Sequence, residues 1–174
     1  MTEEKYRSVK KYSASELVSI EREMRSRGKL VMGLNENLVE RAIDDLLVLA
    51  EMEVDVADIA AKLEDCRWHL FEEIHGPRGL QGDFSDLMGS GTEIDSNYSV
   101  RGVPFEGAVK CPFLDPGKIK YLIHSYIVTR TSDDETLRFT DLGLHMLKEH
   151  HFFSGVEGYT RVDPEKAIDF FKLG

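Results

Sequence analysis

Two stretches of this sequence place an acid, a histidine and a second acid at four-residue steps. The two sets are Asp65, His69 and Glu73, and Asp141, His145 and Glu149. Residues four apart share one face of a helix. Carboxylates and imidazoles are ligands for Zn, Fe or Mn. We therefore predict that two facing helices could supply six ligands to a divalent metal.

The same spacing is also typical of solvent-exposed helix faces on which charged residues pair. Asp65 and His69 lie off the apolar stripe of their helix, which favours this alternative. Two more histidines, His150 and His151, follow His145 at spacings of five and six residues. These spacings are poor for joint ligation with His145, so we interpret both residues as lying near a helix C-terminus, where imidazolium favours the dipole.

The two cysteines suggest different roles. Cys111 lies between Lys110 and Pro112. It is either a nucleophile whose thiol pKa is lowered by the neighbouring lysine, or a small buried side chain. No partner histidine can be identified, because such partners are distant in sequence. Cys66 lies on an apolar helix stripe and is predicted to pack in the core.

These side chains depend on helices whose boundaries the sequence marks in residues 1–75. Ser13 and Glu16 form a capping box for a helix that ends near Arg27. Asn35 or Asn37 caps a second helix through Met52, and Asp55 caps a third ending near Ile74. Apolar residues recur in both at three- and four-residue steps. They are Leu38, Val39, Ala42, Ile43, Leu46, Leu47 and Ala50 in the second helix, and Val56, Ile59, Ala60, Leu63, Cys66, Leu70, Phe71 and Ile74 in the third.

Helical periodicity stops in residues 76–117, which are rich in Gly, Ser, Asp and Pro. Loops longer than about 12–15 residues are uncommon in compact domains unless they are functional or disordered. This segment carries too many apolar side chains for a disordered linker. We predict an irregular, Gly-rich segment that covers the rest of the protein and holds a site or contact surface.

Residues 118–174 contain the signals of an α+β unit. A helix over 117–124, strands over 126–131 and 136–139, and helices over 141–151 and 165–173 are predicted. The order helix, hairpin, helix resembles a winged-helix unit, in which Lys118 and Lys120 on the first helix and Arg130 and Arg138 on the hairpin could contact DNA. The acidic turn between the strands, Asp133 to Glu135, would repel phosphates.

The predicted fold is mainly α, of the α+β class. An N-terminal three-helix bundle (1–75) packs on the C-terminal winged-helix-like unit (118–174), with 76–117 over the junction, as one compact domain.

Charge and composition restrict the partners. The net charge is −10, and residues 31–75 alone hold twelve acidic and three basic groups. This acidic block disfavours phosphate backbones and anionic membranes. No apolar run approaches the ~20 residues of a membrane span, and the first residues lack the apolar core of a secretory signal, so we expect a cytoplasmic protein.

The leading functional hypothesis is a soluble accessory or regulatory protein that acts through protein–protein contact, as a homodimer. The alternatives are a metal-binding protein or metal-dependent enzyme that uses the acid-His-acid helices, and a winged-helix-like DNA-binding regulator. The sequence alone leaves open whether the chain is an enzyme, which partner it binds and whether it takes a divalent metal such as Zn, Fe or Mn.

Overall fold

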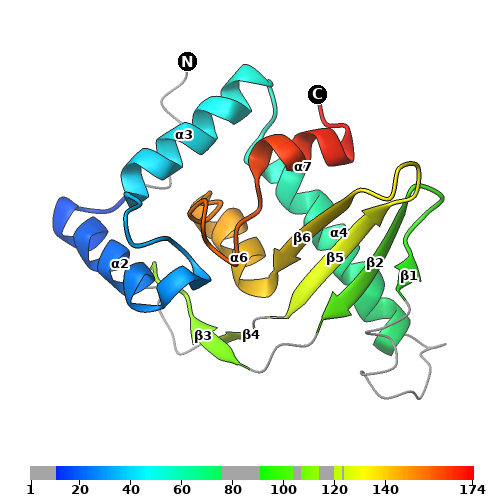
Figure 1. Cartoon of the computed structure of the whole chain (residues 1–174), viewed down its shortest axis with the longest axis horizontal. Coiled ribbons are helices and arrows are strands. Elements are labelled where there is room, and N and C mark those ends of the chain that lie inside the picture. Colours follow the sequence, from blue (N-terminus) through cyan, green and yellow to red (C-terminus); the bar gives the residue numbers. More distant parts are fainter. Residues whose placement is uncertain (1–10, 76–90, 104–106, 114–119, 123) are drawn as a thin grey trace.

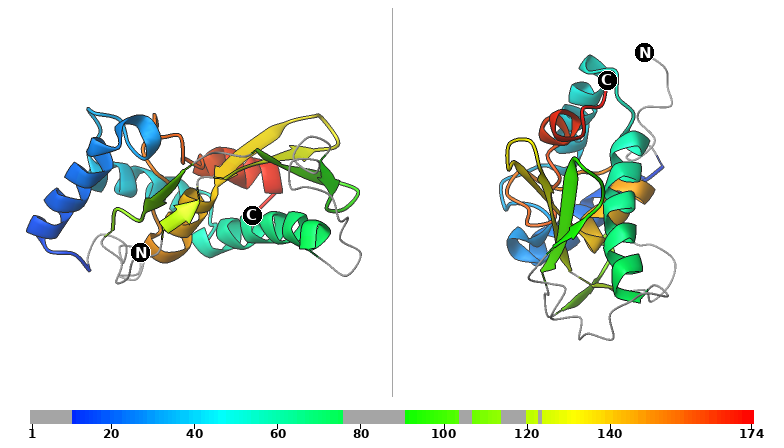
Figure 2. Two further views of the ribbon diagram at one scale, coloured as in Figure 1. Left: turned by 90° about the horizontal axis from the view of Figure 1, so that it is seen from below. Right: turned by 90° about the vertical axis from the view of Figure 1, so that its right-hand side faces the viewer.

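The computed structural model describes residues 11–75, 91–103, 107–113, 120–122 and 124–174. Within these residues the protein is a mixed α+β structure, as the sequence predicts (Figure 1). The main sheet is antiparallel, with strand order β1-β2-β5-β6. Helix α4 packs along one face of this sheet (Figure 2, right). No helix in the described ranges is long and apolar enough to cross a membrane.

Side chains at the predicted caps begin the helices. Helix α2 (Ala14–Ser26) has the capping box of Ser13 and Glu16, and a short 3-10 helix, η2 (Gly28–Leu30), follows it. Asn37 caps α3 (Leu38–Glu51) by accepting from the amides of Val39 and Glu40. Helix α4 covers Val56–His75. Thr140 caps α6 (Asp141–His150), and Asp163 caps α7 (Pro164–Phe171), in which Pro164 opens the first turn.

The strands pair in a register that places apolar residues on one face. β1 (Thr92–Glu93) pairs with β2 (Tyr98–Val103), β2 with β5 (Ser125–Arg130), and β5 with β6 (Thr136–Thr140). Val100 lies opposite Val128, which lies opposite Leu137, and all three are buried. The predicted hairpin is thus confirmed. A separate ribbon joins β3 (Ala108–Lys110) and β4 (Lys120–Leu122).

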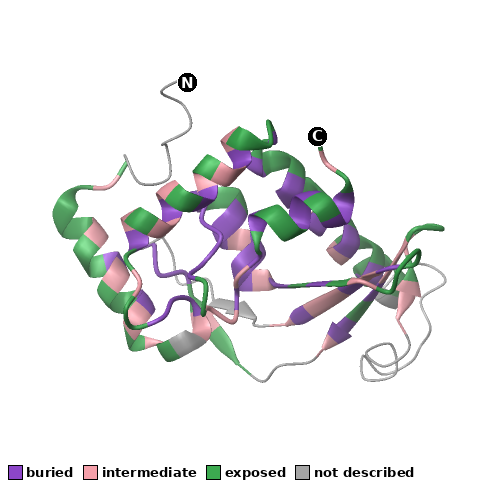
Figure 3. Ribbon diagram, turned by 45° about the horizontal axis from the view of Figure 1, so that its top comes forward, coloured by how far each residue is buried: buried purple, intermediate pink, exposed green. Residues whose placement is uncertain are grey.

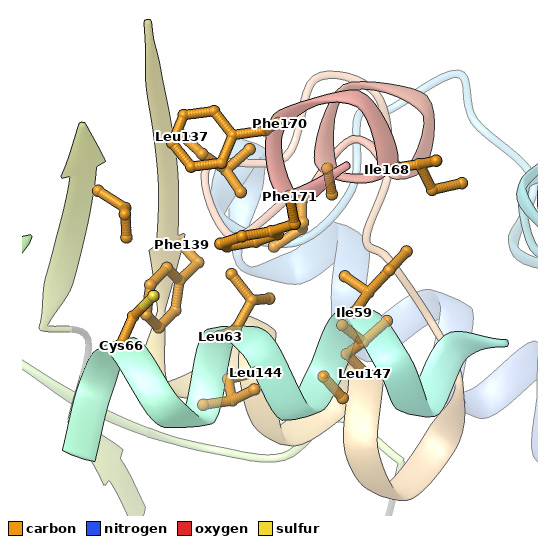
Figure 4. Close-up of a cluster of buried hydrophobic side chains, with 14 of the residues drawn as sticks. Ile59, Leu63, Cys66, Leu137, Phe139, Leu144, Leu147, Ile168, Phe170 and Phe171 are labelled. Carbon is orange, nitrogen blue, oxygen red and sulfur yellow. The ribbon is translucent and has the colours of Figure 1, made fainter. Parts of the chain in front are cut away.

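Two buried clusters form the core. The larger lies between α4, the sheet, α6 and α7, and in it Leu63, Phe139 and Phe171 point into the same space (Figure 4). The smaller joins Ile20 and Met24 of α2 and Leu38 of α3 to Cys111, Phe113 and the other side of α6. Helix α6 therefore belongs to both clusters. Buried residues accordingly lie on the inner sides of the helices, and the outward side of α2 is exposed (Figure 3).

The structure does not confirm an N-terminal three-helix bundle. Helix α4 packs on β2, α6 and α7, whereas α3 packs mainly on α7. The apolar stripe of α4 is therefore buried against the sheet and the C-terminal helices. The predicted stripe of α4 is buried at most positions, although Phe71 is 47% exposed. On α3 only Leu38 and Ala42 of the predicted stripe are buried, Leu47 is 44% exposed, and the buried face also includes Asp45 and Leu49.

Two segments differ from the expected secondary structure. Strands β1, β2 and β3 lie inside 76–117, which we predicted to be irregular. β2 contains Gly102, which weakens a strand, and it pairs with β5 along its whole length. A helix over 117–124 was predicted, but Lys120–Leu122 form strand β4. At these three residues, the first helix expected of a winged unit is therefore replaced by a strand. Residues 76–90 lie outside the described residues.

Candidate metal centre

Three side chains from two separate segments converge beside α6. Cys111 directly follows β3, His145 lies in the middle of α6, and His150 is the last residue of that helix. One ligand atom from each lies within 4.8 Å of the other two. Cys111 is 8% exposed and His150 2%, whereas His145 is partly exposed. Among the described residues, this is the one group of three or more His, Cys, Asp or Glu side chains whose ligand atoms converge in this way.

Cys111 and His150 are in direct contact across the two segments. The sulfur of Cys111 lies 3.3 Å from Nε2 of His150. The imidazoles of His145 and His150 lie 5.4 Å apart between ring centres and are nearly perpendicular, at 77°. A five-residue spacing, which we judged poor for joint ligation, therefore does bring these two rings together. His150 ends the helix, where its ring can turn toward the sulfur.

Aromatic and polar neighbours fix the orientation of His150. The ring of Phe113 stacks on the imidazole at 4.2 Å with an angle of 10° between the planes. The Tyr12 hydroxyl lies 3.2 Å from Nδ1 of His150, and it donates to the Phe113 carbonyl at 3.5 Å. The Tyr12 oxygen can thus accept a hydrogen bond from Nδ1–H of His150, in the tautomer that leaves the lone pair of Nε2 directed at Cys111.

The N-terminal segment makes a second contact with the same ring. The Lys11 ammonium lies 3.4 Å from Nδ1 of His150. Because an ammonium only donates, it can hydrogen-bond Nδ1 only in the tautomer that carries the proton on Nε2, so the metal-binding tautomer uses Tyr12 and not Lys11. The ammonium also lies 5.1 Å from the centre of the Tyr12 ring. Residues 11 and 12 therefore cover the outer side of His150, while Cys111 lies on its inner side. Second-shell partners of this kind orient the histidine ligands of metal sites.

A thiolate and two imidazoles form a donor set for a transition metal. Zn²⁺ binds thiolate sulfur at about 2.3 Å and imidazole nitrogen at about 2.0–2.1 Å, in tetrahedral geometry. Ligand atoms of such an ion are roughly 3.3–3.8 Å apart, so the 3.3 Å separation between Cys111 and His150 fits. Three protein ligands leave a fourth position for water or another group.

The same contact also supplies the histidine that the cysteine nucleophile hypothesis lacked. A cysteine within hydrogen-bond reach of an imidazole, which is itself oriented by a third group, is the arrangement of an activated nucleophile. Here Cys111, His150 and Tyr12 occupy those three positions. Metal binding and thiol reactivity compete for the same sulfur, so a single alkylation experiment with and without metal separates them.

The six residues of the acid-His-acid sets do not converge. On α4, Asp65, His69 and Glu73 are all exposed. On α6, His145 faces Cys111, but Asp141 accepts from Nε of Arg67 and from the Tyr126 hydroxyl, both at 3.0 Å. Asp65 and Glu149 line a groove between the two helices. The helices meet through apolar side chains and through the ion pairs Arg67–Asp141 and Glu64–Lys148, and no three of the six side chains in these sets, all of which the structure describes, come together.

The hairpin arginines considered for DNA contact have intramolecular partners. Arg130 is buried, contacts Asp133 and Glu135, and donates to the Asp169 carbonyl at 3.0 Å. The guanidinium of Arg138 lies 4.2 Å from the centre of the Tyr159 ring. Arg130 thus interacts with the C-terminal end of α7, where a cation is favourable. Lys118 lies outside the described residues.

The second cysteine is a core residue, as predicted, and it provides a pH-dependent test. Burial raises the pKa of the Cys66 thiol to about 12, from its usual 9.0. We expect iodoacetamide to leave Cys66 unmodified in the folded protein near neutral pH and to modify it in denaturant, as read by peptide mass spectrometry. Because its folded pKa is raised, Cys66 contributes stability below pH ~9 that is lost as the pH rises toward 12. Rapid modification of Cys66 in the folded state would contradict its placement.

Comparison with known proteins adds no family to this description. The chain matches no family model, no curated protein and no solved structure. Its function is therefore argued from the geometry of the site.

Proposed function

We propose that this protein binds one transition-metal ion, zinc by preference, through Cys111, His145 and His150. The observation that supports the proposal is the convergence of their ligand atoms within 4.8 Å, from segments 34 or more residues apart in sequence. Thiolate and imidazole together favour Zn²⁺ over Mg²⁺ or Ca²⁺, which prefer oxygen ligands.

The position of the site supports a role in holding the fold. Cys111 belongs to the smaller core cluster, which joins α2 and the start of α3 to α6. An ion bound there would connect the chain after β3 to α6, next to the N-terminal residues Lys11 and Tyr12. Metal binding of this kind is coupled to folding, because the ligands are not preassembled in the unfolded chain. The ion would then fix the chain after β3 against α6, beside the cluster that holds α2 and the start of α3. Structural zinc sites usually have four protein ligands, so this role calls for a fourth donor beside the three named here.

Metal stoichiometry in matched variants tests the proposal. Protein purified without affinity tag or chelator is expected to hold about one equivalent of zinc per chain. Cys111→Ser and His150→Gln should each weaken zinc affinity by about a hundredfold or more in competition with a chromophoric chelator. His69→Ala, on the exposed side of α4, is the control and should bind as the original chain does.

Each result has a defined meaning. Loss of zinc in His69→Ala but not in Cys111→Ser would contradict the proposed ligands and support the acid-His-acid helices. No zinc in the purified protein, and none taken up on titration, would contradict the proposal. Alkylation of Cys111 that zinc does not slow would support the nucleophile hypothesis instead.

The hydrogen bond between Nδ1 of His150 and the Tyr12 hydroxyl predicts a smaller effect on zinc affinity. Tyr12→Phe removes the hydroxyl that contacts Nδ1 but keeps the ring that packs on Phe113. We expect zinc affinity to fall by about tenfold, the lower end of second-shell effects. Tyr159→Phe, whose hydroxyl contacts Ser125 instead, is the control. Unchanged affinity in Tyr12→Phe would show that this hydroxyl does not orient the ligand.

A further inference from the structure

A groove of about 430 Å³ lies between α4 and α6, separate from the metal centre. Its apolar side chains are mostly small, and they are Val56, Ala57, Ala60, Ala61 and Leu147. Ala57 and Ala61 are exposed, although both belong to the long helix that packs on the sheet. Small side chains on a helix let another backbone approach closely. The bottom of the groove is therefore suited to contact with an apolar surface.

The rim of the groove carries one carboxylate that is paired within the protein and two that are not paired with any described residue. Glu64 is already paired, with Lys148 at 3.2 Å and Arg67 at 3.0 Å. Asp65 and Glu149 lie on the same rim, and both are exposed. Within the part of the chain that the structure describes, neither of these two side chains makes a hydrogen bond or an ion pair. The groove thus presents two carboxylates that a cation from another molecule could approach.

The chain around the groove is also negatively charged, like the two carboxylates on its rim. Residues 31–75, which include α3 and α4, carry twelve acidic and three basic groups. A region of this charge attracts cationic molecules and repels anionic ones before contact is made. Charge complementarity therefore selects a basic occupant for the groove.

Trp68 extends the apolar surface along α4. It lies one helical turn beyond Glu64 and is 51% exposed. Its ring stacks on Phe71, with centres 5.4 Å apart and an angle of 22°. Stacking holds the indole in place without burying it, and aromatic anchors of this kind dominate binding energy at protein interfaces.

We propose that the groove and Trp68 form a docking surface for a basic, amphipathic helix of a partner protein. Apolar side chains of that helix would contact Ala57, Ala61 and Trp68, and its Lys or Arg side chains would reach Asp65 and Glu149. This is the helix-in-groove mode of peptide recognition. The proposal does not depend on the metal centre.

The single tryptophan of the chain makes the test possible without a label. The first probe is a synthetic peptide of about 18 residues, with Leu on one helical face and Lys on the other. The second has Glu in place of each Lys. We expect the Lys peptide to change Trp68 fluorescence in a saturable way, with affinity that falls as salt rises from roughly 0.05 to 0.3 M. The Glu peptide should not bind.

Variants locate the site. Asp65→Asn with Glu149→Gln should weaken binding of the Lys peptide by about tenfold, the effect of two exposed ion pairs. Ala61→Arg should abolish binding, because a long cationic side chain would then fill the groove. Glu40→Gln with Glu165→Gln removes two exposed acids from other helices and is the control; it should bind as the original chain does.

Four results would overturn the proposal. They are binding of both peptides alike, binding of neither peptide, unchanged binding in Ala61→Arg, and equal weakening in the control variant. Circular dichroism of each variant confirms that the fold is retained. Self-association that Ala61→Arg disrupts, measured by sedimentation, would show that a second copy of this chain occupies the groove instead.

Discussion

Zinc added to the metal-free protein is expected to raise the midpoint of thermal unfolding by about 10 °C. A ligand that binds only the folded state stabilises it by ~4 kcal/mol when its free concentration is a thousand times the dissociation constant. For a chain of this size, each kcal/mol shifts the midpoint by about 2–4 °C. The ligands come from two distant segments, so the unfolded chain has no preassembled site.

Cys111→Ser is expected to lose most of this shift relative to its own midpoint without metal. His69→Ala should keep the full shift, since the exposed side of α4 takes no part in the proposed site. The measurement is differential scanning calorimetry at several zinc concentrations. A shift of the same size in Cys111→Ser would contradict the role of this cysteine.

Arg161→Met is expected to destabilise the protein by about 3–5 kcal/mol, the effect of breaking a buried ion pair. Arg161 lies in the loop before α7 and contacts both oxygens of Asp45 on α3, at 2.8 and 3.0 Å. It also donates to the Ser154 carbonyl at 2.7 Å. Asp45 is 3% exposed, so removal of the guanidinium leaves a buried carboxylate without its main partner.

Urea unfolding measures this effect. Asp45→Leu combined with Arg161→Met should recover much of the loss, because the buried carboxylate is then gone and Arg41, 4.0 Å from Asp45, keeps its ion pair with Asp44. Lys148→Met, which removes an exposed partner of Glu64, is the control and should cost less than about 1 kcal/mol. A loss below about 1 kcal/mol in Arg161→Met would show that the pair does not hold α3 to the C-terminal loop.

Helix caps and the β5–β6 hairpin could be predicted from the sequence, because neighbouring residues determine them. The caps at Ser13, Asn37, Thr140 and Asp163 all begin helices, and the β5–β6 hairpin follows from two short β-branched runs around a polar turn. Strand β2 could not be found in this way. Tyr98, Val100 and Val103 favour a strand, but they lie in a segment rich in Gly, Ser and Asp, and the partner strand β5 begins more than 20 residues later.

The candidate metal centre shows the same limit of local sequence signals. The sequence singled out His145 and Cys111, but for different sites, and His150 was interpreted as a residue near a helix end. Helical spacing compares residues on one element, so it cannot place a cysteine after β3 beside the end of α6. The available signal was the density of histidines from 145 to 151 together with a cysteine in the same half of the chain. A side chain at the end of a helix is less restricted to one helical face, and this consideration would have allowed His145 and His150 to be predicted as neighbours.

X-ray absorption at the zinc edge tests the central claim most directly. The account predicts one sulfur at about 2.3 Å from the metal and two imidazole nitrogens at about 2.0–2.1 Å, with the sulfur lost in Cys111→Ser. A zinc bound only by oxygen and nitrogen in the original chain would contradict the site formed by Cys111, His145 and His150.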